Sequence, residues 1–146
     1  MSLEVLVAKS KIKELVDTFS NLADEKKIPE QMFLFTPETV VKVYIGENLV
    51  FDILGTKQLE EVFTSFTANV KRSYHINGQQ VVNVEGNSAT GISYCLVQLI
   101  TEENGKEIIT QHSVRYNDTF VLNNGTWLIK ERISHFMITD VRTLQS

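Results

Sequence analysis

Three short turn sequences divide the second half of the chain, and they constrain its fold more than any other feature. They are Glu85-Gly86-Asn87, Glu103-Asn104-Gly105 and Asn123-Asn124-Gly125. Asn-Gly and related pairs tolerate the positive φ of tight hairpin turns. The runs between them, residues 73–85, 88–101, 106–122 and 126–139, are rich in Val, Ile, Thr, Tyr and Phe, which fit a pleated, half-buried surface. The sequence therefore predicts a meander of four long antiparallel strands, and strands of this length favour a strongly bent sheet.

Helical periodicity marks two segments of the first half. Apolar residues three and four positions apart predict helices over residues 3–27 and 57–71, with Pro29 ending the first and Thr56 as the N-cap of the second. Between them we expect a short apolar piece at 30–35 with room for one helical turn, a turn at 36–38, and a hairpin of strands at 39–45 and 49–54. Because helices and strands segregate along the chain, the fold class is α+β. A bent sheet wrapped around two helices makes a cone with an internal pocket.

Length and composition exclude several classes of protein. A chain of 146 residues forms one domain, residues 1–146, with a proper core. A net charge of −4 without a Lys/Arg cluster argues against a nucleic-acid partner. No apolar run approaches the ~20 residues of a membrane span, and no basic region precedes the short apolar patch at the N-terminus. Because Cys95 has no second cysteine to pair with, we expect a soluble cytoplasmic protein with no membrane partner, and Cys95 as a small buried hydrophobe.

The chemistry-bearing motifs of metal and cofactor enzymes are missing from the sequence. The three histidines are scattered, and neither an H-E-x-x-H motif nor paired cysteines occur. There is no glycine-rich phosphate loop and no nucleophile elbow. We therefore expect no metal and no cofactor, so that any reaction would depend on acid–base chemistry by side chains.

Polar residues alternate along the third strand of the meander. His112, Tyr116 and Asp118 share one side with apolar residues, as in the wall of a ligand pocket. The alternative is that this side packs on the helices and satisfies its polar groups internally. Arg132 on the last strand is able to hold a substrate carboxylate, or to pair with an internal acid such as Asp118 or Glu131. Tyr44 and Tyr94 are candidate phenol donors, although tyrosine is common in strands.

Several motifs together carry a resemblance to a known family. They are LVDTF at 15–19, AD at 23–24, FLFTPE at 33–38, G-x-x-x-L at 55–59, His75, YND at 116–118, NNGTWLI at 123–129 and Arg132. In order and spacing the chain resembles the SnoaL-like branch of the nuclear transport factor 2-like superfamily, with members of the scytalone dehydratase and bile acid dehydratase type. The resemblance implies a cystatin-like cone around an apolar cavity, which agrees with the fold inferred above.

The resemblance also implies roles for individual residues. Asp24 and His75 match the carboxylate and imidazole that dehydratase-like members place in the cavity, and would form a catalytic acid–base pair. The alternatives are a solvated Asp24 near a helix end and an edge-strand His75. Asn117 stands where relatives often have histidine, which argues against a second catalytic imidazole at that position. The expected ligand-binding residues are Phe19, Tyr44, Tyr94, His112, Tyr116, Asp118 and Arg132.

Two functions remain open at this point, because this superfamily includes both enzymes and proteins without catalysis. One is a cofactor-independent lyase or isomerase acting on a small hydrophobic molecule, with Tyr116 and Arg132 orienting the substrate. The other is a module that binds a small ligand or serves for dimerisation. We also expect a homodimer through the outer face of the sheet. Strand alternation would place on this face Thr119 and Val121 of the third meander strand and Ile129, Ile133 and Met137 of the last strand.

Overall fold

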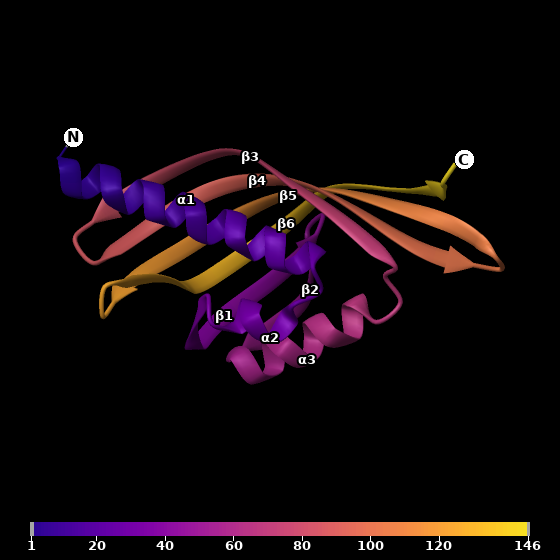
Figure 1. Ribbon diagram of the computed structural model, residues 1–146, viewed down its shortest axis with the longest axis horizontal. Coiled ribbons are helices and arrows are strands. Elements are labelled where there is room, and N and C mark those ends of the chain that lie inside the picture. The colour runs from indigo at the N-terminus through magenta and orange to yellow at the C-terminus, as the bar shows by residue number, and fades with distance from the viewer. Residues whose placement is uncertain (1, 146) are drawn as a thin grey trace.

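A bent six-stranded sheet with helices on one face forms the protein (Figure 1). The structure is a computed structural model and describes residues 2–145. The elements in chain order are α1 (Leu3–Asp24), α2 (Ile28–Met32), β1 (Phe35–Ile45), β2 (Asn48–Leu54), α3 (Thr56–Thr67), β3 (Arg72–Glu85), β4 (Ser88–Glu103), β5 (Lys106–Asn123) and β6 (Thr126–Thr143). The sheet order is β2-β1-β6-β5-β4-β3. Figure 1 shows α1 lying along the sheet, with α2 and α3 beside β1 and β2.

The predicted α+β class and the four-stranded antiparallel meander are confirmed, since β3, β4, β5 and β6 pair in sequence order. The predicted hairpin of β1 and β2 also forms. The sequence did not predict how the hairpin joins the meander. β1 lies parallel to β6, with Val41 opposite Arg132 and Val43 opposite Ser134, and this pairing extends the concave face around the helices.

Bulges bend the sheet and decide which residues face inward. The ladder between β5 and β6 shifts twice, which leaves Lys130 and Met137 without a directly opposed residue. A bulge bends its strand and increases the local twist. The shift at Lys130 turns Ile129 to the concave side, where it pairs with Phe120 and is 0% exposed. The prediction that Ile129 belongs to the outer face was therefore wrong, because simple alternation fails at a bulge.

The first helix ends three residues earlier than predicted, in a Schellman motif. The N–H of Lys26 donates to the carbonyl of Ala23, and the N–H of Lys27 donates to the carbonyl of Leu22. Lys26 has a φ of 58°, the left-handed conformation that this motif needs. Asp24 is therefore the last residue of α1, and its position is fixed by the way the helix ends.

Both prolines and the predicted N-cap also differ from expectation. Pro29 lies in the first turn of α2, where its missing N–H costs nothing, rather than only ending a helix. Pro37 lies within β1 instead of in a turn. The pairing of β1 with β6 is interrupted between Phe35 and Val40, so no ladder bond is lost there. Gly55, with a φ of 85°, is the N-cap of α3 in place of Thr56, because this φ suits glycine.

The apolar faces of α1 and α3 pack on the concave side of the sheet. The buried core joins both helices to the sheet and includes Ile12, Val16, Phe19, Leu59, Val82, Phe120 and Ile129. Within residues 2–145, no helix is both long and apolar enough to cross a membrane. The core occupies one end of the concave face and leaves the other end to a cavity.

The inward orientation of Ile129 leads to a stability prediction. Ile129→Ala should lower the free energy of unfolding by about 2–5 kcal/mol, as expected for a large core residue. Its neighbour Leu128 pairs with Val121 on the outer face and is only partly buried, so Leu128→Ala should cost clearly less. Urea unfolding followed by circular dichroism measures both values. An equal or larger loss in Leu128→Ala would contradict the bulged register.

Candidate active site

A cavity of about 160 Å³ lies on the concave side of the sheet, closed by residues of α1, α2 and α3. Its walls are mostly apolar and rich in aromatic rings: Phe19, Phe51, Phe63, Phe66, Tyr116 and Phe136. A few polar side chains share the wall, among them His75, His112 and Arg132. Apolar walls with a few convergent polar groups are typical of small-molecule sites.

Asp24 and His75 form a direct pair at this cavity. The Asp24 Oδ1 atom lies 2.6 Å from His75 Nδ1, and Oδ2 accepts the backbone N–H of His75 at 2.8 Å. The hydroxyl of Ser73 donates to Oδ1 at 2.9 Å. A carboxylate only accepts hydrogen bonds, so Nδ1 carries a proton, and Nε2 has a lone pair whenever the imidazole is neutral. His75 therefore presents a base next to the apolar cavity.

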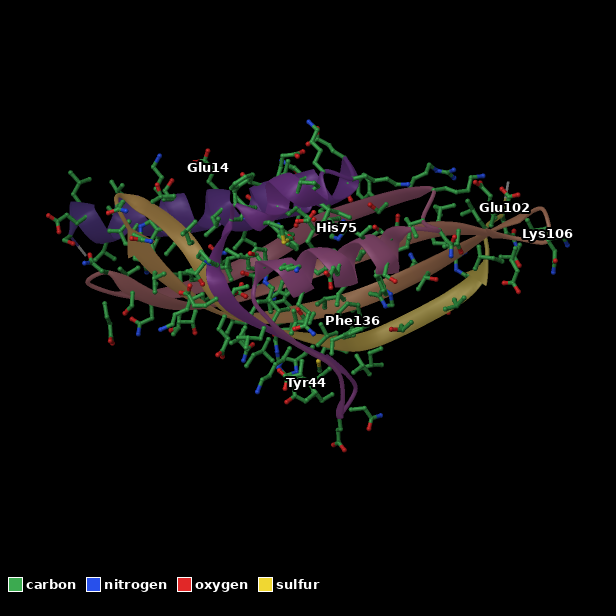
Figure 2. The ribbon with its side chains drawn as sticks, turned by 90° about the horizontal axis from the view of Figure 1, so that it is seen from below. Glu14, Tyr44, His75, Glu102, Lys106 and Phe136 are labelled. Atoms are coloured by element: carbon green, nitrogen blue, oxygen red, sulfur yellow. The ribbon has the colours of Figure 1, made fainter. Side chains whose placement is uncertain are left out.

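The two members of the pair occupy different positions. The His75 side chain is 12% exposed and lines the cavity, whereas the Asp24 side chain is 27% exposed and lies behind the imidazole. In Figure 2, His75 is seen beside α1, far from Glu102 and Lys106 at the tip of the β4–β5 hairpin. The expected direct link is present, but only His75 is part of the cavity wall.

A second contact holds α1 on β3 close to this pair. Asn77, two residues after His75, donates to Asp17 Oδ1 at 2.9 Å and accepts the Ser20 hydroxyl at 3.2 Å. His75 and Asn77 lie on the same side of β3 because strand side chains alternate. Two successive inward residues of β3 thus bind α1, and this fixes the end of the helix over the strand.

A buried ion pair occupies another part of the cavity wall. Arg132 donates to both oxygens of Asp118, from Nε at 2.8 Å and from Nη2 at 3.0 Å. Its guanidinium lies 3.8 Å from the ring centre of Tyr116 and 4.7 Å from that of Phe19. Burial alone would lower the pKa of Arg132, but the Asp118 carboxylate, with further contributions from Tyr116 and Cys95, raises this pKa. The cation is therefore permanent at a site lined by rings.

One donor of this arginine is free. Nη1 of Arg132 is buried and has no hydrogen-bond partner among residues 2–145. An unpaired buried donor is costly, and a ligand oxygen in the cavity would supply the missing acceptor. Asp118, expected as a ligand-binding residue, instead lies behind Arg132 and does not line the cavity.

His112 and Tyr116 line the cavity as expected, together with Phe19. His112 Nδ1 lies 2.9 Å from the hydroxyl of Thr139, and its ring packs edge-to-face on Phe136 with centres 4.8 Å apart. Burial lowers the pKa of His112 below its usual range, so the ring is neutral at pH 7. Burial likewise raises the pKa of the Tyr116 hydroxyl, which remains protonated.

Two of the predicted ligand-binding residues lie on the wrong side of the sheet. Tyr44 stacks on His135, with ring centres 5.4 Å apart and an interplanar angle of 17°. Tyr94 is opposite Arg115 on the outer face and is partly exposed. The inward residues of these strands are their neighbours, such as Val43 and Cys95. Both tyrosines were chosen for their chemistry, and strand alternation places them outside.

The structure also adds cavity residues that sequence reasoning missed. Lys26 lines the cavity and donates from Nζ to the carbonyl of Val70. Gln31 is buried in the wall and donates to the carbonyl of Phe19 at 3.1 Å. No periodic pattern marks either residue, because both lie in the irregular segment around α2. Within the described part of the chain, no cluster of three or more His, Cys, Asp or Glu residues could hold a metal ion.

Cys95 is buried beside Tyr116, in the smaller apolar cluster of the sheet. Burial raises the pKa of its thiol to about 11, so the side chain is not a thiolate at neutral pH. This agrees with its predicted role as a small buried hydrophobe.

Solved structures of other proteins share this fold over nearly the whole chain. A candidate scytalone dehydratase from Novosphingobium aromaticivorans DSM 12444 has a TM-score of 0.83 and 20% identity, and the match covers 100% of this chain and 95% of that one. A hexachlorocyclohexane dehydrochlorinase, LinA type 2, has a TM-score of 0.76 and 12% identity, with 99% and 93% covered. The β subunit of a candidate aromatic-ring-hydroxylating dioxygenase from Novosphingobium aromaticivorans DSM 12444 has a TM-score of 0.78 and 20% identity, with 92% of each chain covered.

At these identities the likeness establishes the fold and nothing further. No curated protein matches the chain in sequence. The chain does, however, match the sequence model of a protein family. The model of the SnoaL-like domain matches residues 4–133, from the first turn of α1 to the middle of β6. With this match and the cone-shaped fold, the chain belongs to the SnoaL-like family of the nuclear transport factor 2-like superfamily.

Proposed function

We propose that the protein is a cofactor-independent lyase or isomerase, of the dehydratase type, that acts on a small hydrophobic molecule in the cavity. The observation that carries the proposal is the 2.6 Å contact between Asp24 and His75, with the imidazole at an apolar cavity. A base held by a carboxylate and shielded from water suits proton transfer at carbon. The fold is shared with a candidate scytalone dehydratase and with a dehydrochlorinase, which supports elimination chemistry.

The proposed reaction begins with proton transfer to His75. Nε2 takes a proton from a carbon next to a carbonyl, and the Asp24 carboxylate stabilises the imidazolium that forms. The electron pair of the C–H bond forms a carbon–carbon double bond, and a hydroxyl on the next carbon leaves with its bonding electrons. The imidazolium returns its proton to this hydroxyl, which departs as water. In an isomerisation the same proton is returned to a different carbon.

Arg132 would bind an oxygen atom of the substrate and help to orient the molecule in the cavity. Its guanidinium lies in the cavity wall, where Nη1 has no partner in the described part of the chain, and its orientation is fixed by Asp118 and by the rings of Phe19 and Tyr116. A donor that is already oriented loses little freedom when a ligand binds. Tyr116 contributes by holding the guanidinium in place, and Phe19 forms the apolar wall on the other side.

The proposed base can be tested without knowing the natural substrate. Cyclohexanone deuterated next to its carbonyl should exchange deuterium for hydrogen faster in the presence of the protein than in buffer, as followed by proton NMR. His75→Asn should lower this rate by about 100-fold or more, the range expected for a general base. Asp24→Asn should also lower it, since the imidazolium then loses its counter-charge.

His135 supplies the matched control, because it stacks on Tyr44 outside the cavity. His135→Asn should exchange at the wild-type rate, and all variants should retain the wild-type circular dichroism spectrum. If wild type, His75→Asn and Asp24→Asn exchange at one rate, the catalytic proposal is rejected. The chain would then be better described as a ligand-binding or dimerisation module. The β subunit of a candidate dioxygenase shares the fold and supports this alternative, because that protein is one subunit of a larger assembly.

We further propose that the chain forms a homodimer through the outer face of the sheet. Exposed apolar side chains gather there on adjoining strands: Tyr74, Ile76, Ile92, Tyr94, Leu96 and Ile138. Ile76, Leu96, Ser113 and Ile138 occupy one row across β3, β4, β5 and β6. In the adjacent row, Arg115 has a buried Nε without a partner among residues 2–145. Apolar residues around an arginine and a tyrosine are typical of the centre of an interface.

A charge at the centre of this face should separate the subunits. Wild type should give a light-scattering mass of twice 16.6 kDa at micromolar concentration, and Leu96→Glu should give 16.6 kDa, because Leu96 is 56% exposed in the middle of the row. Val7→Glu, at an exposed position of α1 away from the sheet face, is the control and should leave the mass unchanged. A wild-type mass of one chain would contradict the dimer.

A further inference from the structure

The cavity contains a second imidazole in the same row of the sheet as His75. His75 on β3 is opposite Val97 on β4, Val97 is opposite His112 on β5, and His112 is opposite Thr139 on β6. His75, Val97 and His112 all line the cavity. Two strand spacings of about 4.8 Å place the Cα atoms of the two histidines about 10 Å apart. The side chains stand on the concave face, so a ligand lying over Val97 has one imidazole on each side.

His112 is held in this position by neighbours on β6. Its Nδ1 contacts the Thr139 hydroxyl at 2.9 Å, and its ring rests edge-to-face on Phe136. No carboxylate is among its hydrogen-bond partners in residues 2–145, in contrast to His75 with Asp24. The two imidazoles therefore differ in their surroundings: the ring of His75 contacts a carboxylate, whereas the ring of His112 contacts a hydroxyl.

The Thr139 contact is compatible with a proton on Nε2 of His112, because a threonine hydroxyl is able to donate to Nδ1 as well as to accept from it. A neutral imidazole has one donor and one acceptor nitrogen, and a threonine hydroxyl can donate. When Thr139 donates to Nδ1, Nε2 carries the hydrogen and offers it away from β6. Burial keeps the ring neutral, as the lowered pKa of His112 indicates. A neutral imidazole that donates to a carbonyl oxygen is an established electrophile in enzymes.

We propose that His112 donates from Nε2 to the carbonyl oxygen of a small cyclic ketone or enone whose adjacent carbon faces His75. This assignment rests on the proposed function, and names the substrate class for it. Removing a proton beside a carbonyl builds negative charge on the carbonyl oxygen, so a donor is needed opposite the base. His112 is the donor in the same row as His75, whereas Arg132 is in register with Asp118, six residues further along β5.

The size of the cavity limits the ligand to about one ring. Its volume of about 160 Å³ is close to the ~150 Å³ of an apolar cavity that encloses benzene. The cavity wall around the two imidazoles is apolar, with Val97, Leu99 and Phe136 among its residues. A monocyclic ketone fills this space, and larger substituents would extend through the open side of the cavity.

The test compares two ring compounds of the same shape, cyclohexanone and methylenecyclohexane, in which =CH₂ replaces =O. Dissociation constants come from NMR titration of ¹⁵N-labelled protein, and the measured quantity is the ratio of the ketone value to the alkene value. His112→Phe keeps an aromatic ring but removes the donor, and should raise this ratio about tenfold, as expected for one lost hydrogen bond. His112→Gln places an amide N–H near the position of Nε2 and should keep the ratio close to that of wild type.

Two further readouts make the outcome decisive. Long-range ¹H–¹⁵N spectra at pH 7 should show His112 neutral with its proton on Nε2, and His135→Phe, outside the cavity, should leave the ratio unchanged. A ratio that is the same in wild type and His112→Phe overturns the proposal, as does a charged His112 or a proton on Nδ1. If the His112 effect is found but deuterium exchange does not depend on His75, the ketone site stands and the catalytic function fails. If deuterium exchange depends on His75 but the ratio of dissociation constants does not depend on His112, the catalytic function stands and the proposed ketone site is rejected.

Discussion

The bend of the sheet is the constraint on which the rest of the structure depends. Bulges opposite Ser113–Val114 and Thr119–Phe120 let β6 curve while it stays paired with β5, and β1 then continues the curve by lying parallel to β6. A flat sheet of this width could not enclose α1 and α3. The curvature creates a concave side large enough for a packed core at one end and a cavity at the other.

Within this shell, the contacts that stabilise α1 also prepare the site. Asn77 forms hydrogen bonds with Asp17 and Ser20. Asp24 accepts hydrogen bonds from the backbone N–H and from the ring Nδ1 of His75. The carboxylate thus anchors the end of the helix and orients the imidazole at the same time. Changes to this contact should affect stability and proton transfer together, and a variant that keeps the hydrogen bonds but loses the charge is needed to separate the two.

The sequence was most informative where local chemistry decides. Turn residues such as Asn104 and Asn124, both with positive φ, define the meander, and helical spacing identifies α1 and α3. The roles of Asp24 and His75 came from resemblance rather than from periodicity, and the structure brings these two residues together. Tyr44 and Tyr94 show the limit of choosing residues by chemical type, because strand alternation places both of them outside the cavity.

What the sequence by itself determined is the set of elements, their order and the amphipathic faces, since each depends on residues near one another in the chain. Only the tertiary structure decided that β1 pairs with β6, that Ile129 faces inward, and that His75, Val97 and His112 form one row. Register and bulges are set by contacts between distant segments, and a shift of one residue reverses every side chain beyond it. The positions of the candidate site residues follow from that register, which no local pattern in the sequence encodes.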